Sequence, residues 1–169
     1  MELRIAGKAR IVGDDVNTDY IISSSRKKET PDAEQLKKYL FETIDPSFAA
    51  SVQPDDLLVA GKNFGCGSAM EIAVSVLLAA GFKAVLARSF ARTFYRNAIN
   101  NGLVPVECDT RAIQEGDHLI LSLDEQAIKV TNETRNLNLV SSPFPPIILN
   151  LVSAGGLVPY FKIHHNFVI

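Results

Sequence analysis

The chain is most informative between residues 59 and 71, which read Val59-Ala60-Gly61-Lys62-Asn63-Phe64-Gly65-Cys66-Gly67-Ser68-Ala69-Met70-Glu71. The apolar run that ends at Ala60 is typical of a buried strand, and a helical pattern begins at about Met70. The glycines between them permit backbone conformations that other residues resist. Ser68 stands where the helix should begin and Glu71 follows three residues later, which is the spacing of a capping box. The stretch predicts a serine hydroxyl and free backbone N–H groups at the positive end of a helix, which suits a carboxylate or phosphate.

The segments that follow repeat the strand-then-helix pattern. Apolar residues at helical spacing continue from residue 72 to Gly81, which closes the helix. We then predict a strand over 84–87, a helix over 91–100 that Gly102 ends, and a strand over 104–107. Such β-then-α steps predict a parallel sheet with crossover helices.

The regions on either side differ in character. Residues 3–12 alternate like a strand, and 13–19 form a polar, turn-rich loop. We predict that 23–29 is a polar, mobile loop, and that Thr30 caps a helix that has Pro31 at its first position and runs to about Phe41. Asp45 and Pro46 repeat this start signal for a short helix that ends near Val52.

Beyond Asp109 the pattern becomes that of short antiparallel strands, at 119–123, 127–131 and 137–140. A last helix is predicted from about Pro146 to Gly155-Gly156. The whole predicts an α/β fold that adds an antiparallel β portion to a parallel sheet. At 169 residues, the chain is expected to form a single domain, 1–169.

Composition narrows the possible functions. The 17 Lys and Arg residues against 19 Asp and Glu give a formal net charge of −2, and no basic block stands out, so we expect no nucleic-acid partner. No apolar run approaches the roughly 20 residues that a membrane helix needs, and the first residues lack the apolar core of a signal peptide. We therefore expect a cytoplasmic protein with no membrane association.

Only two cysteines, Cys66 and Cys108, are present. Two thiols cannot make a disulfide framework, a four-cysteine iron–sulfur site or a four-cysteine zinc site. We expect no metal and no cofactor to be bound by this chain itself.

Several segments together resemble one family, the small subunits of isopropylmalate dehydratase, which are similar to the swivel domain of aconitase. The segments are Gly13-Asp14-Asp15-Val16-Asn17-Thr18-Asp19 with Ile21-Ile22, Asp45-Pro46-Ser47-Phe48, Val59 to Ser68, Ser89 to Leu103, and Ala154-Gly155-Gly156-Leu157. They span almost the whole chain.

The resemblance implies a three-layer β/β/α swivel-type fold and a two-subunit hydro-lyase. In this family the large subunit carries a [4Fe-4S] cluster whose open iron binds the substrate hydroxyl and a carboxylate. The pair, a heterodimer or heterotetramer, removes and re-adds water on a hydroxy di- or tricarboxylic acid. The resemblance implies 3-isopropylmalate as that acid, in leucine biosynthesis. Self-association of the isolated chain stays open.

The resemblance also implies site residues. Ser68 matches the serine that acts as the base, and Gly67, Ala69 and Met70 belong to the loop that binds substrate. Arg26 or Lys28 is expected to contact the variable part of the substrate, with Lys27 left open as an alternative because the register is uncertain by a residue.

Two positions depart from the family pattern Gly-Ser-Ser-Arg-Glu, because Ala69 replaces the second serine and Met70 replaces the arginine. Methionine cannot make the two-pronged, charge-assisted contact that arginine makes with a carboxylate. Two alternatives follow: a paralogue for homoaconitate, citramalate or dimethylmalate, or a non-catalytic partner subunit on the same scaffold.

Other interpretations of these residues must be weighed. Ser68 could be only a helix cap. Gly65-Cys66-Gly67 begins like a dinucleotide-binding motif, but residue 70 is not the third glycine. The aspartates between 14 and 19 are expected to form a turn, since their spacing matches no calcium loop. For Arg92 and Arg96, four residues apart on one helix, we expect a structural role, with contact to a partner as the alternative.

Overall fold

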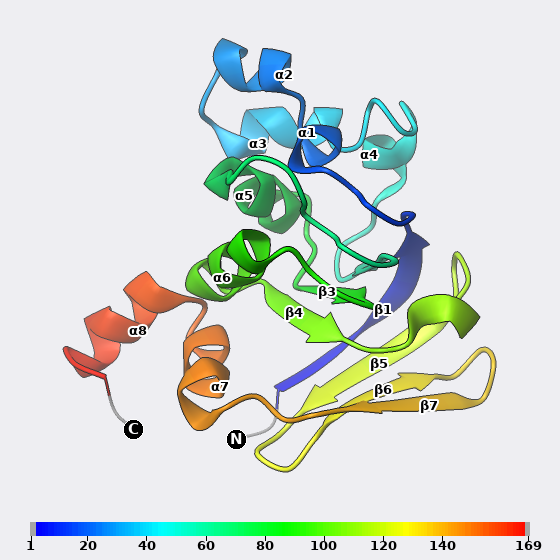
Figure 1. The fold of residues 1–169 in the computed structure, drawn as a ribbon, viewed down its shortest axis with the longest axis vertical. Coiled ribbons are helices and arrows are strands. Elements are labelled where there is room, and N and C mark those ends of the chain that lie inside the picture. The colour runs from blue at the N-terminus through cyan, green and yellow to red at the C-terminus, as the bar shows by residue number, and fades with distance from the viewer. Residues whose placement is uncertain (1–2, 168–169) are drawn as a thin grey trace.

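The first strand, β1 (Leu3–Ile11), is shared by both halves of the fold in this computed structural model, which describes residues 3–167. Leu3–Lys8 pair antiparallel with β5 (His118–Leu123), and Ala9–Ile11 pair in parallel with β2 (Leu57–Val59). The sheet has the strand order β4-β3-β2-β1-β5-β6-β7 (Figure 1). β1 therefore joins a parallel half to an antiparallel half.

The parallel half contains β2, β3 (Ala84–Ala87) and β4 (Val104–Glu107), connected by the helices α5 (Glu71–Ala79) and α6 (Arg92–Asn101). Every residue of β2 and β3 is buried, as expected for parallel strands covered on both faces. The predicted parallel sheet with crossover helices is confirmed.

The antiparallel half contains β5, β6 (Ile128–Asn132) and β7 (Leu137–Ser141), reached from β4 through the 3₁₀ turn η2 (Thr110–Ala112). These strands lie where the sequence predicts them. The chain then forms α7 (Pro146–Ser153) as expected, but it continues into a further helix, α8 (Leu157–His164), which we did not predict.

Two hydrophobic cores lie between three layers of secondary structure. Leu58 and Val85 face the helices on one side of the parallel strands, whereas Leu57, Val59 and Leu86 face the antiparallel strands on the other. Alternate residues of a strand point to opposite faces, so each parallel strand contributes to both cores. The second core contains the inward residues Leu119, Leu121, Leu123, Ile128 and Val130. The resulting helix, sheet and sheet layers are those of the predicted β/β/α arrangement.

The segment between β1 and β2 forms five short helices, of which the last confirms the predicted short helix that ends near Val52, and the third and fourth lie within the helix predicted up to Phe41. They are α1 (Thr18–Ile21), α2 (Ser24–Glu29), α3 (Ala33–Leu36), the 3₁₀ turn η1 (Lys37–Tyr39) and α4 (Phe48–Ser51). The loop predicted at 23–29 is therefore wrong: it is helix α2, capped by the Ser23 side chain. The cap predicted at Thr30 is also wrong, because the Asp32 side chain accepts the Glu34 N–H at 3.0 Å and so caps α3.

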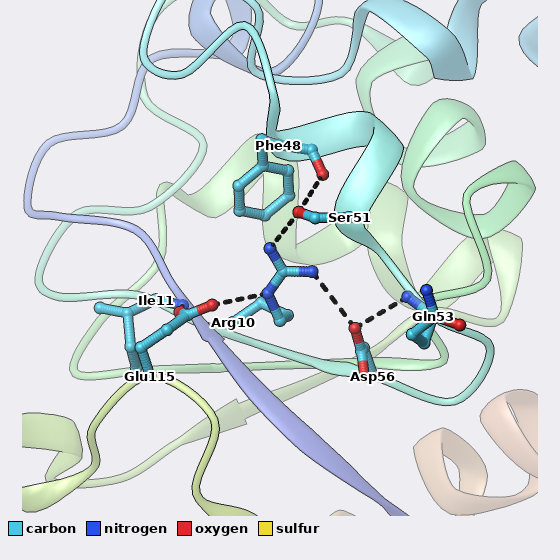
Figure 2. Close-up of polar contacts among 7 residues, drawn as sticks. All are labelled: Arg10, Ile11, Phe48, Ser51, Gln53, Asp56 and Glu115. Atoms are coloured by element: carbon cyan, nitrogen blue, oxygen red, sulfur yellow. Dashed lines mark hydrogen bonds and ion pairs between the residues drawn. The ribbon is translucent and has the colours of Figure 1, made fainter.

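A buried arginine ties the layers together (Figure 2). The Arg10 side chain on β1 donates to Glu115 at 2.7 Å, to Asp56 at 3.3 Å and to the Ser51 hydroxyl at 2.7 Å. Its guanidinium carbon lies 4.7 Å from the centre of the Phe48 ring. Only 12% of the Arg10 side chain and 5% of the Asp56 side chain are exposed. One side chain thus connects β1, helix α4, the turn before β2 and the turn before β5.

No single helix among residues 3–167 is both long and apolar enough to cross a bilayer. Among these residues, only α7 and α8 taken together have the length and composition of a membrane-spanning segment, and the two helices are bent by 96° relative to each other.

Candidate functional site

The loop between β2 and α5, residues 61–70, lies at the carboxyl end of the parallel strands and is held from both sides. On one side, Thr18 N–H donates to the Cys66 carbonyl and Thr18 Oγ1 donates to the Ser68 carbonyl, both at 2.9 Å. Gly65 N–H donates to the Val16 carbonyl at 2.9 Å. The backbone around Ser68 is therefore positioned by the segment that precedes α1.

Gly67 is required for this close approach. Its φ is +87°, and a Cβ at this position would lie 2.5 Å from the side-chain amide of Asn17. That amide also caps α1, because its oxygen accepts the Asp19 N–H at 2.9 Å. The sequence reasoning assigned no role to Asn17 or Thr18, although an asparagine before Thr-Asp is a helix-cap signal.

On the other side, the loop pairs with the segment between β3 and α6. Phe64 N–H donates to the Ser89 carbonyl at 3.0 Å, and Ala91 N–H donates to the Phe64 carbonyl at 2.9 Å. The Phe64 ring meets Phe94 edge-on, with ring centres 5.0 Å apart. Helix α6 is thus joined directly to the loop that carries Ser68.

Asp14 and Asp15 support the same loop. Asp14 accepts the Lys62 N–H at 2.8 Å and pairs with Arg88 at 2.6 Å, and Asp15 accepts from the Asn63 side chain at 2.9 Å. The Lys62 N–H bond and then the Arg88 hydrogen bond hold the pKa of Asp14 below its ordinary value. These contacts join Asp14 and Asp15 to residues distant in sequence, whereas the sequence predicted the side-chain-to-backbone bonds of a local turn. Among residues 3–167 no group of three or more His, Cys, Asp or Glu side chains is placed to hold a metal ion.

The capping box predicted at Ser68 is wrong. Helix α5 begins at Glu71, and its N-cap residue is Met70, whose extended backbone (φ −134°, ψ 109°) places Ser68 two residues too early to cap it. Ser68 and Ala69 are exposed. Within the described residues, neither the Ser68 hydroxyl nor the N–H groups of Ser68 and Ala69 make a hydrogen bond. These groups are thus available to a ligand at the start of α5.

Helix α2 brings one cation to the loop. Lys27 Nζ contacts the Met70 sulfur and lies 3.7 Å from an Asp19 carboxylate oxygen. No other hydrogen bond or ion pair joins α2 to residues 61–70 within the part of the chain that the structure describes.

The other two candidate cations on α2 lie differently. Arg26 pairs with Glu42 at 2.9 Å and Glu29 at 3.1 Å, and its guanidinium carbon lies 3.8 Å from the centre of the Tyr39 ring. The hydrogen bond to Glu42 is the main reason that the pKa of Arg26 is raised. Lys28 is exposed and makes no ion pair within residues 3–167.

The chain belongs to the Aconitase C-terminal domain family, whose profile matches residues 14–111. Over 162 residues it is 43% identical to the 3-isopropylmalate dehydratase small subunit of Halothermothrix orenii, a match that covers 95% of this chain and 96% of that one. It is 42% identical to the methanogen homoaconitase small subunit of Methanocaldococcus jannaschii, covering 94% and 91% of the two chains.

A solved structure agrees with these relatives. The crystal structure of 3-isopropylmalate dehydratase from Methanocaldococcus jannaschii matches with a TM-score of 0.86 and 40% identity, covering 96% of each chain. The resemblance and the fold inferred from the sequence are confirmed. Both the isopropylmalate dehydratase and the homoaconitase relative are named as small subunits, as the resemblance implies.

Proposed function

We propose that this chain is the small subunit of a two-subunit hydro-lyase, a cytoplasmic 3-isopropylmalate dehydratase of leucine biosynthesis. The observation that carries the proposal is the loop around Ser68. Its hydroxyl and two backbone N–H groups are unpaired within the described residues, at the start of α5, on a backbone braced from both sides. A homoaconitase-type acid is the second candidate, because a relative with that name is 42% identical.

In this proposal Ser68 is the base that takes a proton from the substrate carbon next to the hydroxyl-bearing carbon. An unassisted serine hydroxyl is a poor base, so its oxyanion needs stabilisation from its surroundings. The positive end of α5 and the Lys27 ammonium group supply it. The Ser68 and Ala69 N–H groups hold a substrate carboxylate at the start of the helix.

The iron–sulfur cluster of this enzyme would belong to a large partner subunit. This chain supplies two thiols, too few for a cluster. Burial, and then the Asp109 charge, raise the pKa of the Cys108 thiol to about 11, which disfavours the thiolate that would bind a metal. In the partner, the cluster would bind the substrate hydroxyl and a carboxylate. We propose a heterodimer or heterotetramer that forms the complete site.

Lys27 replaces the charge that Met70 lacks. A guanidinium at residue 70 would bind a substrate carboxylate from the loop itself, whereas here an ammonium group reaches the same place from α2. Arg26 or Lys28 remains the proposed contact for the variable part of the substrate. The ion pairs of Arg26 also fix α2 against Glu42, so Arg26 helps to orient Lys27.

The test is anaerobic co-expression with the iron–sulfur large subunit of the same source. Turnover of isopropylmalate, homocitrate, citrate, citramalate and dimethylmalate is then followed by the ultraviolet absorbance of the unsaturated product. We expect one acid to be dehydrated only when both chains are present. A stable complex that turns over none of these acids would favour the non-catalytic subunit instead.

Within that complex, Ser68→Ala is expected to lower kcat by two or more orders of magnitude, as for loss of a general base. Because the hydroxyl has no partner among residues 3–167, the free energy of unfolding should change by less than about 0.5 kcal/mol. Thr131→Ala is a matched control, since it removes a hydroxyl of β6 that bonds Asn138 in the antiparallel half, and it should leave kcat unchanged. Unchanged kcat in Ser68→Ala would refute the assignment of the base.

A further inference from the structure

Helix α6 carries two arginines with no counter-ion. Arg92 and Arg96 are exposed, one turn apart, and neither makes an ion pair within residues 3–167. The structural role that we expected for them from the sequence therefore has no contact to support it. Five other arginines are paired with carboxylates, namely Arg10, Arg26, Arg88, Arg111 and Arg135.

These two arginines are mounted rigidly beside the candidate site. Phe94 and Ala98 are buried on the opposite side of α6, Ile99 is buried in its last turn, and Gly102 ends the helix in a left-handed conformation. The residue before Arg92 donates its N–H to the Phe64 carbonyl of the site loop at 2.9 Å. Any protein that covers the loop around Ser68 must therefore lie near the first turns of α6.

Aromatic side chains surround the arginines. Phe90 and Tyr95 are half-buried, their ring centres 5.8 Å apart, and they line a cavity of about 230 Å³ together with Arg92, Arg96 and Glu107. Burial, and then the charge of Glu107, raise the pKa of the Tyr95 hydroxyl. Arginine and aromatic residues together are the composition of the energetically important parts of protein interfaces.

We propose that this α6 face, formed by Phe90, Arg92, Tyr95 and Arg96, binds an acidic surface of the large subunit. The inference rests on the proposed function and names where the two subunits meet. A macromolecular partner fits better than a free small anion, because the arginines lie beside the half-buried rings of Phe90 and Tyr95, and this composition is that of protein interfaces. The chain has a net charge of −2, yet none of its described carboxylates pairs with these two guanidinium groups. Carboxylates of a partner protein would complement them.

The test measures the affinity of this chain for the purified large subunit by biolayer interferometry at 50 and 300 mM NaCl. Arg92→Glu and Arg96→Glu are each expected to weaken binding by about 10-fold or more, and the double variant further. Binding of the wild-type chain should weaken with salt. Arg4→Glu is the matched control: Arg4 is also exposed and without an ion pair in the described residues, but lies on β1, and its reversal should leave the affinity unchanged.

The outcomes separate the inference from the proposed function. Wild-type affinity in the double variant, with normal turnover of the complex, would overturn the inference and leave the proposed function intact. If the double variant bound the large subunit with unchanged affinity but had a raised KM, the inference would also be overturned. The arginines would then be assigned to the binding of a small anion. If the wild-type chain neither binds nor activates the large subunit, the proposed function fails and the inference with it. Circular dichroism on each variant confirms that the fold is kept.

Discussion

Lys27 and Met70 bring a cation of helix α2 into contact with the loop that carries Ser68. They are 43 residues apart in sequence, yet the ammonium group and the thioether are in contact. In the family pattern the cation belongs to the loop, whereas here the loop is neutral at residue 70 and helix α2 supplies the cation. In the proposed function, the substrate carboxylate would therefore be bound by two elements, the loop and helix α2.

Replacing Lys27 by Gln tests this assignment. We expect KM for the acid substrate to rise by about 10-fold, since a hydrogen bond to a charged group contributes about 1.5–3 kcal/mol. The effect on kcat should be smaller than that of Ser68→Ala. Steady-state kinetics of the reconstituted complex measure both constants.

Lys129→Gln is the control for this variant, because Lys129 is an exposed residue of β6 in the antiparallel half. A KM equal to that of the wild type in Lys27→Gln would exclude Lys27 as the carboxylate contact. If Lys28→Gln raised KM instead, Lys28 would have to be assigned both roles: the contact with the variable part of the substrate and the cation that binds the substrate carboxylate.

For single residues, the sequence predicted the loop around Ser68 but not the residue that caps α5 or the contact of the loop with α2. Ser68 and the glycines were recognised from their spacing, and the structure places them in the loop that leads to α5. The cap was predicted wrongly because the spacing does not reveal that Met70 stays extended. The contact of Lys27 with Met70 could not be predicted, since it depends on how α2 packs.

Among the elements, β1 and α4 are connected by the buried Arg10 rather than by apolar packing alone. Removing one partner of a buried ion pair leaves the other charge without compensation, which is costly. Asp56 would lose the Arg10 contact and keep the Gln53 N–H bond at 2.9 Å. Figure 2 shows that Glu115 and Ser51 would lose the same partner.

Arg10→Gln is therefore expected to lower the free energy of unfolding by about 3 kcal/mol. Urea unfolding followed by circular dichroism gives this value. Lys37→Gln serves as the comparison, because its pair with Glu34 is exposed and should contribute less than about 1 kcal/mol. Equal losses in the two variants would show that Arg10 does not hold the layers together.

Helix α2 was predicted as a loop, and its composition explains the error. None of its residues is buried, so it has no apolar stripe from which a helix could be predicted. Its contacts are polar, through Ser23, Arg26 and Lys27. The helix after it was misplaced by two residues because Thr30 and Asp32 are both good capping residues and only the structure shows which one is used.

For the molecule as a whole, resistance to acid is expected to depend on Asp117. It is 2% exposed and accepts hydrogen bonds from Gln114 N–H at 2.9 Å, Asn132 Nδ2 at 2.7 Å and Arg135 Nε at 2.7 Å. Burial alone would raise the pKa of this carboxyl. The hydrogen bonds and the Arg135 charge outweigh burial, and the pKa lies below the ordinary value of 3.8.

A carboxyl whose pKa is lower in the folded than in the unfolded chain stabilises the fold above the unfolded pKa. That stabilisation is lost as pH falls below about 4 and through the folded pKa. Asp117→Asn should therefore be less stable than the wild type at pH 7, and the difference should narrow below about pH 4. Thermal unfolding across pH 2–7 measures it, with Glu125→Gln, an exposed substitution, as the control. A constant difference across this range would contradict the assignment.

Most of the architecture could be predicted from the sequence. Fully apolar runs marked the parallel strands, and period-two alternation marked the antiparallel ones. Helix α8 was missed because Gly155-Gly156 was interpreted as the end of the last helix, whereas it is a turn. Gly156 has a φ of +115°, and a Cβ there would lie 2.5 Å from the Asn100 carbonyl, so its role comes from packing against α6.

The shared strand β1 also has a consequence during protein synthesis. β1 leaves the ribosome first, but the strand that pairs with most of it, β5, begins at His118. At ~5–20 residues per second, on the order of 5–20 s pass between the two. The nascent chain can complete its parallel half in that time, while one edge of β1 stays open to pairing with other chains. The edge of β1 that pairs with β5 is therefore covered only after the whole parallel half has been synthesised.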